Sequence, residues 1–186
     1  YKGVTNKVQK GLNLTGKLDI NDITFEALGG VSEVGATSYF INWKGTKILV
    51  DAGKRNTRNN SKPEYDEINP NIDYLLITHV HQDHCGSLME YSDYFNPKKI
   101  FATRETKECL LPAIMDARKI LLTNYHKNLN ELKHFVDIPV EEISDETKRQ
   151  LTNNKIKKFI SRIVEINYET TINIGNLNFR LLNTSH

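Results

Sequence analysis

A cluster of histidines directly after an apolar run is the feature that most restricts how this chain can fold. The run Tyr74–Thr78 has the length and apolar content of a buried strand, and the six residues His79–His84, HVHQDH, follow it without a spacer. In an extended chain, residues i and i+2 point to the same side. His79 and His81 can therefore face one common point at the end of a strand.

The same cluster has the chemistry of a metal site. Imidazole and carboxylate groups are the ligands that proteins use for zinc and similar transition metals. His79 and His81 can reach one ion, while the turn into a following helix can aim Asp83 and His84 at a second ion nearby. Two metal ions about 3.5–4 Å apart suit hydrolysis. We therefore predict two zinc ions, with manganese or iron as alternatives.

Short apolar runs separated by turn residues predict strands along much of the chain. The predicted strands are Ile23–Leu28, Ser38–Trp43, Lys47–Val50, Tyr74–Thr78, Lys99–Thr103, Arg162–Asn167, Thr171–Ile174 and Leu177–Leu182. Helical spacing and caps predict a helix of about ten residues that stops at Pro97, a helix over Glu105–Tyr125 and a short helix over Ser144–Leu151. Strands with helices interposed are typical of an α/β layered domain.

The length and composition fit one globular domain. A chain of 186 residues with 38% hydrophobic and 26% charged residues can bury a core. We expect the polar residues 1–23 to form an extension of low order or a peripheral hairpin, and residues 24–186 to form the domain. The polar segment 54–71 predicts a surface loop.

Charge and hydropathy exclude several classes of protein. The 25 Lys and Arg residues nearly balance the 23 Asp and Glu residues, so the net charge of +2 does not by itself argue for a polyanionic partner. The basic residues between 148 and 162 follow acidic ones and predict a solvated face of mixed charge. No apolar run predicts a membrane span, and the polar first residues do not resemble a secretory signal.

The cysteines point to a reducing compartment. Cys85 and Cys109 form no spaced disulfide framework. Cys85 follows the histidine cluster, where we expect it to pack as a small apolar residue rather than to bind metal. We therefore expect an intracellular, cytoplasmic protein without a membrane partner.

The spacing His79-x-His81-x-Asp83-His84 resembles the HxHxDH signature of the metallo-β-lactamase fold superfamily. The strand that ends at Asp51-Ala52-Gly53 is similar to the first motif of that superfamily. The resemblance implies a metallo-β-lactamase αββα sandwich, of which this chain would hold the first part only. It also implies that Asp51 lies beside the metals and organises the site through hydrogen bonds.

A narrower resemblance concerns the β-CASP branch of this superfamily, the branch of RNase J and of the nuclease subunit of the cleavage and polyadenylation specificity factor. Residues 28–35, LGGVSEVG, resemble its glycine-rich opening loop, and residues 111–120 are similar to the helix that follows its Thr-rich turn. At the end of the chain, the small residue Ser185 before His186 is typical of the branch. The resemblance implies that His186 completes the first metal site with His79 and His81, and that the domain is truncated after this third metal motif.

The resemblance implies a ribonuclease that hydrolyses RNA phosphodiester bonds at a dinuclear zinc site, with DNA as an alternative substrate. Asp83 and His84 would be its catalytic residues, and Asp83 would accept a proton from the attacking water. Two other readings stay open. One is a small-molecule metallo-hydrolase acting on a thioester, lactone or β-lactam, and the other is a non-catalytic RNA-processing scaffold subunit. The sequence leaves the oligomeric state and the choice between endonuclease and exonuclease open.

Overall fold

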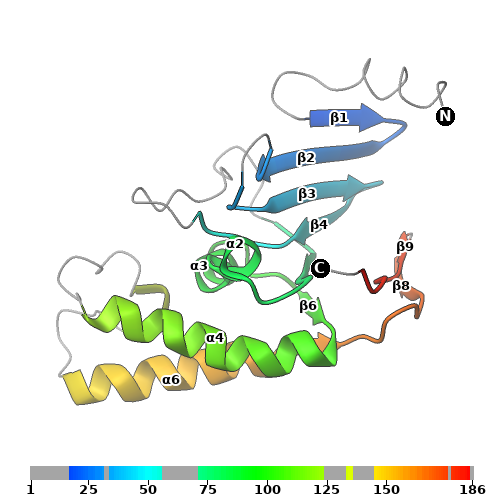
Figure 1. Cartoon of the computed structure of the whole chain (residues 1–186). Coiled ribbons are helices and arrows are strands. Elements are labelled where there is room, and N and C mark those ends of the chain that lie inside the picture. The colour runs from blue at the N-terminus through cyan, green and yellow to red at the C-terminus, as the bar shows by residue number, and fades with distance from the viewer. Residues whose placement is uncertain are drawn as a thin grey trace.

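A computed structural model describes residues 17–31, 34–55, 71–123, 133–135, 145–175 and 177–184 (Figure 1). In this part of the chain, seven strands form one sheet in sequence order. They are β1 (Lys17–Ile20), β2 (Ile23–Gly29), β3 (Ser38–Trp43), β4 (Thr46–Val50), β5 (Tyr74–Leu76), β6 (Lys99–Ala102) and β7 (Ile163–Glu165). A separate hairpin consists of β8 (Ile172–Ile174) and β9 (Leu177–Phe179).

The helices lie on one face of the sheet and the β8–β9 hairpin lies on the other (Figure 1). The described helices are α2 (Gln82–Cys85), α3 (Leu88–Phe95), α4 (Arg104–Thr123), α6 (Asp145–Ser161) and the short 3₁₀ helix η2 (Lys133–Phe135). Among them, none combines the length and the apolar character that a bilayer crossing needs.

The first half of the sheet is antiparallel, with two-residue turns between β1 and β2 and between β3 and β4. Strand β1 pairs with β2, and the two residues between them, Asn21 and Asp22, both have positive φ angles of 47° and 67°. This geometry is that of a type I′ turn, which Asn and Asp tolerate well. The β1–β2 hairpin therefore agrees with the hairpin alternative for the first 23 residues. The sheet begins at Lys17, inside the segment that the composition assigned to an extension.

The second half of the sheet is parallel, because β4, β5, β6 and β7 all run in the same direction. Helices α2 and α3 connect β5 to β6, and α4 and α6 connect β6 to β7. In a parallel sheet, the carboxyl ends of neighbouring strands meet at one edge. The residues that follow β4 and β5 are therefore brought together, although they are far apart in the sequence.

The main core lies between the sheet and the helices. Alternate strand residues such as Leu75 and Ile100 are buried against helical residues such as Leu110, Ile156 and Phe159. The last two explain why α6 extends to Ser161 and not, as predicted, to Leu151. Their spacing places both on the inner face, so burial continues the helix past its polar beginning.

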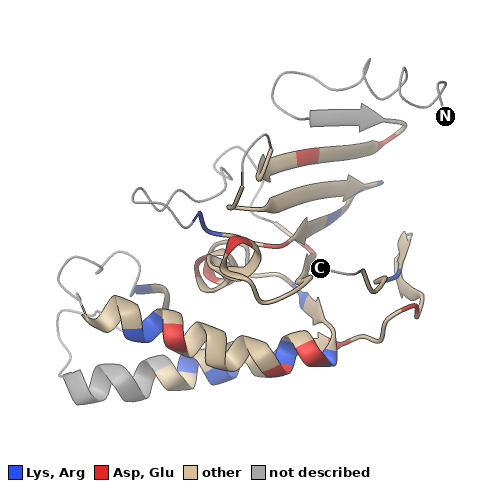
Figure 2. Ribbon diagram, viewed as in Figure 1, with Lys and Arg blue, Asp and Glu red and all other residues tan. Residues whose placement is uncertain are grey.

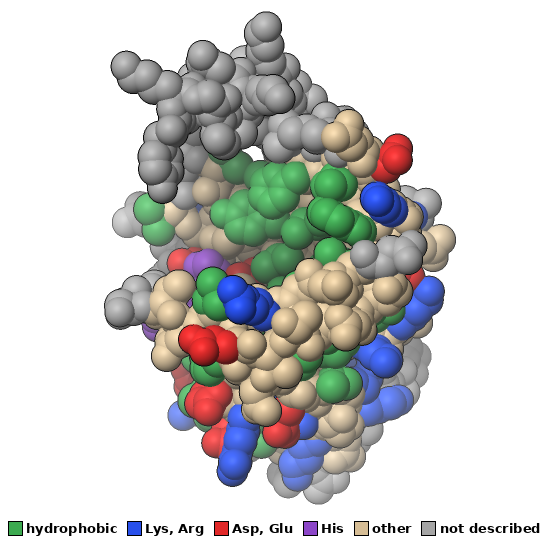
Figure 3. Space-filling view, turned by 90° about the vertical axis from the view of Figure 1, so that its right-hand side faces the viewer, with side chains coloured by type: hydrophobic (Ala, Val, Ile, Leu, Met, Phe, Trp, Pro, Cys, Tyr) green, Lys and Arg blue, Asp and Glu red, His purple; other side chains and the backbone are tan. Residues whose placement is uncertain are grey.

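The opposite face of the sheet is apolar and hollowed, as Figure 3 shows. Tyr74, Leu76 and Phe101 point to this side, and the ring of Phe179 lies 6.0 Å from that of Phe101. A cavity of about 340 Å³ lies between these strands and the β8–β9 hairpin. The hairpin thus packs on part of the second face.

The outer surface of the helices carries charges of both signs, which Figure 2 shows interspersed along α4. Arg104 pairs with Glu108 at 2.8 Å within α4, and Lys155 of α6 pairs with Asp93 at 2.9 Å. Solvent screens ion pairs at a protein surface, so such pairs contribute little to stability. The predicted face of mixed charge concerns residues 148–162, whose side chains the structure describes only in part, and it stays a prediction.

The predicted surface loop 54–71 begins with a buried residue. Only 8% of Lys54 is exposed, and its N–H donates a hydrogen bond to the Gln82 carbonyl at 2.9 Å. The prediction is therefore wrong for Lys54, because this residue still belongs to the segment that packs against α2. Residues 56–70 lie outside the described part of the chain.

Asp73 connects three strands at the amino edge of the parallel sheet. Its carboxylate accepts a hydrogen bond from the Lys47 N–H at 2.9 Å and one from the Lys98 ammonium at 2.6 Å. Partial burial raises the pKa of Asp73, but the Lys47 N–H and the Lys98 ammonium outweigh burial and hold this pKa below its usual value of 3.8. The folded state therefore binds a proton at Asp73 less readily than the unfolded state.

Asp73→Asn is expected to remove part of the acid sensitivity of the protein. A lowered carboxyl pKa stabilises the fold above the unfolded-state pKa, and this stabilisation disappears as the pH falls through the folded-state pKa. At pH 7 the variant should lose about 1 kcal/mol of unfolding free energy. Urea unfolding at pH 7 and near pH 3 should show that the difference between the two proteins shrinks at low pH. A pH-independent difference would contradict this role for Asp73.

Candidate metal centre

The predicted ligands gather at the carboxyl edge of β4 and β5. His79 and His81 lie in the loop from β5 into α2, and His84 lies in α2 itself; residues 79–84 together are called the histidine loop below. The ring centroid of His79 lies 4.9 Å from that of His81 and 4.0 Å from that of His84. Asp83 lies beside them, with its Oδ2 at 3.6 Å from Nε2 of His84. The structure thus brings His79, His81, Asp83 and His84 together.

Backbone hydrogen bonds hold this loop against the segment that follows β4. The N–H of Ala52 donates to the His84 carbonyl, and the N–H of Thr37 donates to the Asp83 carbonyl, both at 2.9 Å. Gly53 donates in turn to the Thr37 carbonyl at 2.9 Å. Three segments of the chain are thereby joined by main-chain groups, which fixes the position of the histidine loop independently of its side chains.

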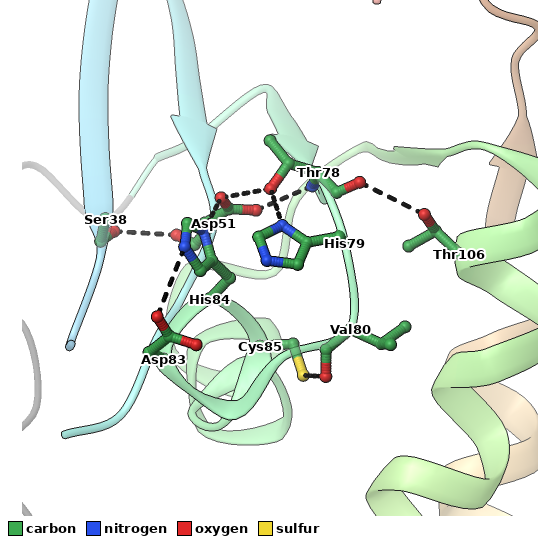
Figure 4. A network of polar contacts seen from close by, with 9 residues as sticks. All are labelled: Ser38, Asp51, Thr78, His79, Val80, Asp83, His84, Cys85 and Thr106. Atoms are coloured by element: carbon green, nitrogen blue, oxygen red, sulfur yellow. Dashed lines mark hydrogen bonds and ion pairs between the residues drawn. The ribbon is translucent and has the colours of Figure 1, made fainter. Parts of the chain in front are cut away.

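Asp51 is the buried centre of the side-chain network in Figure 4. Its Oδ1 accepts the N–H of Thr78 at 2.8 Å, and its Oδ2 accepts the Thr78 hydroxyl at 2.6 Å. The same Oδ2 lies 2.8 Å from Nδ1 of His84. Asp51 also adopts a positive φ of 61°, which Asp tolerates better than most residues, and Ser38 donates to its carbonyl at 2.8 Å. Asp51 is therefore hydrogen-bonded to the cluster, and its supporting role beside metal ions stays a prediction.

The contact with Asp51 also changes the protonation of His84. The hydrogen bond to Asp51 raises the pKa of His84; burial opposes this, and the negative charges of Asp51 and Asp83 add to the increase. Because Nδ1 of His84 is engaged by the carboxylate, Nε2 is the ring nitrogen through which this residue can bind a metal ion. A carboxylate behind a ligating imidazole is a common arrangement in metal sites.

Cys85 packs in the core, as predicted. Its thiol donates to the Val80 carbonyl at 2.9 Å. Burial, followed by the charges of Asp51 and Asp83, raises the pKa of the Cys85 thiol to about 12. The thiol therefore stays protonated at neutral pH, which makes it a poor nucleophile and a poor metal ligand.

The donor chemistry of the loop fits zinc, manganese or iron, since it offers imidazole and carboxylate groups together. Within the described residues, however, no group of three or more His, Cys, Asp or Glu side chains stands in an arrangement that could already hold an ion. The side chains of Asp83 and His84 face each other in this structure. His186, the expected third ligand of the first ion, lies outside the described residues. The closed coordination of either metal remains a prediction.

Two threonines beside the site, Thr78 and Thr106, are not among the residues that the sequence motifs predict. Thr78 contacts both Asp51 and His79, with its Oγ1 at 3.0 Å from Nδ1 of His79. Thr106, near the beginning of α4, donates to the Thr78 carbonyl at 3.2 Å. A threonine directly before the first histidine, at the end of a predicted strand, is the signal that could have identified Thr78.

Comparison with known proteins agrees with this architecture. A family model described as the metallo-beta-lactamase superfamily matches residues 31–147. This chain belongs to that superfamily, and the predicted fold class is confirmed. The superfamily fold implies divalent metal ions.

Curated relatives narrow the assignment. The chain is 29% identical over 174 residues to "Endoribonuclease YSH1" of Eremothecium gossypii, which covers 91% of this chain and 21% of that protein. It is 30% identical over 171 residues to "Cleavage and polyadenylation specificity factor subunit 3-I" of Arabidopsis thaliana, covering 90% of this chain and 22% of the relative. Identity reaches 41% over 93 residues, 48% of this chain and 11% of the relative, with "Endoribonuclease YSH1" of Yarrowia lipolytica. The chain therefore spans about a fifth of the length of the first two relatives. Their similarity to this chain confirms the predicted resemblance to the β-CASP branch.

Proposed function

We propose that the protein is a metal-dependent ribonuclease that hydrolyses RNA phosphodiester bonds at a dinuclear zinc site. The observation that carries this proposal is the gathering of three histidine rings and Asp83 at one sheet edge, around a buried Asp51. Two relatives that match about nine-tenths of this chain are named "Endoribonuclease YSH1". These names support RNA as the substrate.

The residues divide into two ligand sets. His79 and His81, together with His186, would hold one ion, and Asp83 and His84 would hold the other. When bound, two zinc ions polarise a phosphoryl oxygen and make a water nucleophilic at neutral pH. The side chain of Asp83 is 38% exposed, so its carboxylate is accessible for the proton of the attacking water. Asp51 keeps His84 oriented through the 2.8 Å contact at Nδ1.

The relatives favour this function over the other two readings. A thioester, lactone or β-lactam hydrolase would also use the same loop, but the curated relatives quoted above are named for RNA cleavage or for cleavage and polyadenylation. A non-catalytic scaffold would not need the complete HxHxDH spacing, which this chain has kept. The same names support an intracellular location, and the predicted cytoplasmic location stays a prediction.

His81→Ala is expected to abolish RNA cleavage in the intact protein. The substitution removes one proposed ligand from a loop whose backbone is held by other segments, so the fold should remain. Loss of a supporting residue behind a ligand already costs about 10–100-fold in affinity or activity, and loss of a ligand itself should cost more. Cleavage of labelled single-stranded RNA and elemental analysis of bound zinc, manganese and iron would measure the effect.

His134→Ala provides the matched control. His134 is a partly buried histidine in η2, on the helical face of the sheet, where its Nδ1 lies 3.5 Å from Oδ2 of Asp93 in α3. This variant should keep both the metal content and the cleavage rate of the wild type. Equal cleavage by His81→Ala and wild type would refute the proposed site, whereas hydrolysis of nitrocefin or a thioester without action on RNA would refute the substrate class.

A further inference from the structure

Thr78 bridges Asp51 and His79 in the candidate metal centre. Its hydroxyl oxygen lies 2.6 Å from Oδ2 of Asp51 and 3.0 Å from Nδ1 of His79 (Figure 4). The backbone N–H of the same residue donates to Oδ1 of Asp51 at 2.8 Å. Thr78 is therefore held by two hydrogen bonds to Asp51, and its hydroxyl also contacts the ring of His79.

The donors and acceptors available at Asp51, Thr78 and His79 determine which group donates in each hydrogen bond. An ionised carboxylate only accepts hydrogen bonds, and a hydroxyl has one proton to donate. The short contact to Asp51 uses that proton, so the hydroxyl oxygen can only accept at its contact with His79. The proton between Thr78 and His79 must then sit on Nδ1 of His79. Nε2 of this ring is consequently the nitrogen with a lone pair for a metal ion.

A second chain of hydroxyls holds Thr78 from the side of α4. The Thr103 hydroxyl donates to the Thr106 hydroxyl at 3.1 Å and accepts the Thr106 N–H at 3.2 Å. The Thr106 hydroxyl then donates to the Thr78 carbonyl at 3.2 Å. Thr103 and Thr106 are buried, with 1% and 6% of their surface exposed, so these bonds are shielded from water. The amino end of α4 thereby fixes the backbone of Thr78.

We propose that Thr78 is a positioning residue that holds His79 in the Nδ1–H tautomer, so that its Nε2 faces the metal. The carboxylate of Asp51 then orients two imidazole rings. It contacts the ring of His84 directly and orients the ring of His79 through the Thr78 hydroxyl. This inference rests on the proposed metal site for its functional meaning. The tautomer itself is a property of the metal-free chain and can be measured without any metal.

The first test is a nitrogen spectrum of the metal-free protein labelled with ¹⁵N-histidine. Long-range ¹H–¹⁵N correlations distinguish the two neutral tautomers, and loss of the signal in His79→Gln identifies His79. Wild type should show the Nδ1–H form. Thr78→Val, which keeps the shape but lacks the hydroxyl, should shift His79 toward the Nε2–H form that imidazole prefers in water. Thr78→Ser should restore the wild-type signal.

The second test is the zinc affinity of the same proteins, measured by competition with a chelator. Thr78→Val should bind zinc about 10–100-fold more weakly, and Thr78→Ser should bind it close to wild type. If wild type binds no zinc, the proposed function fails, and the spectrum still decides the inference. A wild-type His79 in the Nε2–H form, or Thr78→Val with unchanged tautomer and affinity, would overturn the inference and leave the ribonuclease proposal standing. Should Thr78→Val not fold, the wild-type spectrum alone is decisive.

Discussion

Gly53→Ala is expected to be among the most destabilising single substitutions in this domain. An added Cβ would lie 1.7 Å from the Asp83 carbonyl oxygen and 2.6 Å from the Thr37 nitrogen. Both atoms belong to the backbone, and they are hydrogen-bonded to each other at 2.9 Å. Neither can move without opening the junction that positions the histidine loop. We expect a loss of at least about 3 kcal/mol of unfolding free energy, measured by urea denaturation.

Gly45→Ala is the matched control for this prediction. Gly45 lies in the β3–β4 turn with a φ of 88°, and no atom would lie within 4 Å of its added Cβ. Its cost should therefore come from backbone strain alone, at about 1 kcal/mol. Gly53→Ala should also reduce zinc binding, since it separates the segments that hold Asp83. Equal losses of stability in the two variants would mean that the backbones do not approach closely at Gly53.

Asp51→Asn is expected to destroy the metal site while the sheet survives. Asn keeps the size of Asp and tolerates the φ of 61° at this position. Its amide, however, replaces one of two accepting oxygens by a donor. If the NH2 group of Asn takes the place of Oδ1, it faces the N–H of Thr78, and two donors meet. If it takes the place of Oδ2, the Thr78 hydroxyl and His84 must accept a hydrogen bond instead of donating one. Either outcome disturbs the orientation of the ring nitrogens that a metal needs.

The expected result for Asp51→Asn is a loss of zinc affinity of at least about 10–100-fold, accompanied by the loss of RNA cleavage. Asp73→Asn makes the same chemical change at the opposite edge of the sheet, where Asp73 accepts from Lys47 and Lys98. It should lower stability but leave the zinc affinity unchanged. Zinc competition and urea unfolding of both variants separate the two effects. An Asp51→Asn protein with wild-type zinc affinity would show that Asp51 does not support the site.

The sequence predicted the local features of the fold well. The range of β3, Ser38–Trp43, coincides with its prediction, because alternating apolar residues and flanking turns report a strand directly. The sequence does not distinguish the β1–β2 hairpin from an extension, since a polar edge strand has little apolar pattern and only the Asn21-Asp22 turn marks the hairpin. Helix α6 was predicted too short, because its polar first half hides the apolar positions Ile156 and Phe159 that bury it.

In the candidate site too, residues that are close in the sequence could be predicted, whereas contacts between distant segments could not. His79, His81, Asp83 and His84 are close in sequence, so their types and spacing could be recognised without a structure. The bonds from Asp51 to Thr78 and His84 cross 27 and 33 positions. They depend on the parallel pairing of β4 with β5, which no residue pattern specifies. Asp51 was therefore found through a family resemblance, and Thr78 was not found.

The main-chain junction between the histidine loop and the segment after β4 has a consequence for how the protein acquires its site during folding. Thr37, Ala52 and Lys54 bind carbonyls of residues 82–84, so distant parts of the chain must meet before the loop is fixed. Closing the loops between distant segments costs conformational entropy before their contacts stabilise the fold, and folds rich in such contacts form more slowly. A synthetic peptide containing HVHQDH would carry the same ligands without their orientation. Transplanting the motif into another scaffold would therefore require the neighbouring strand ends as well.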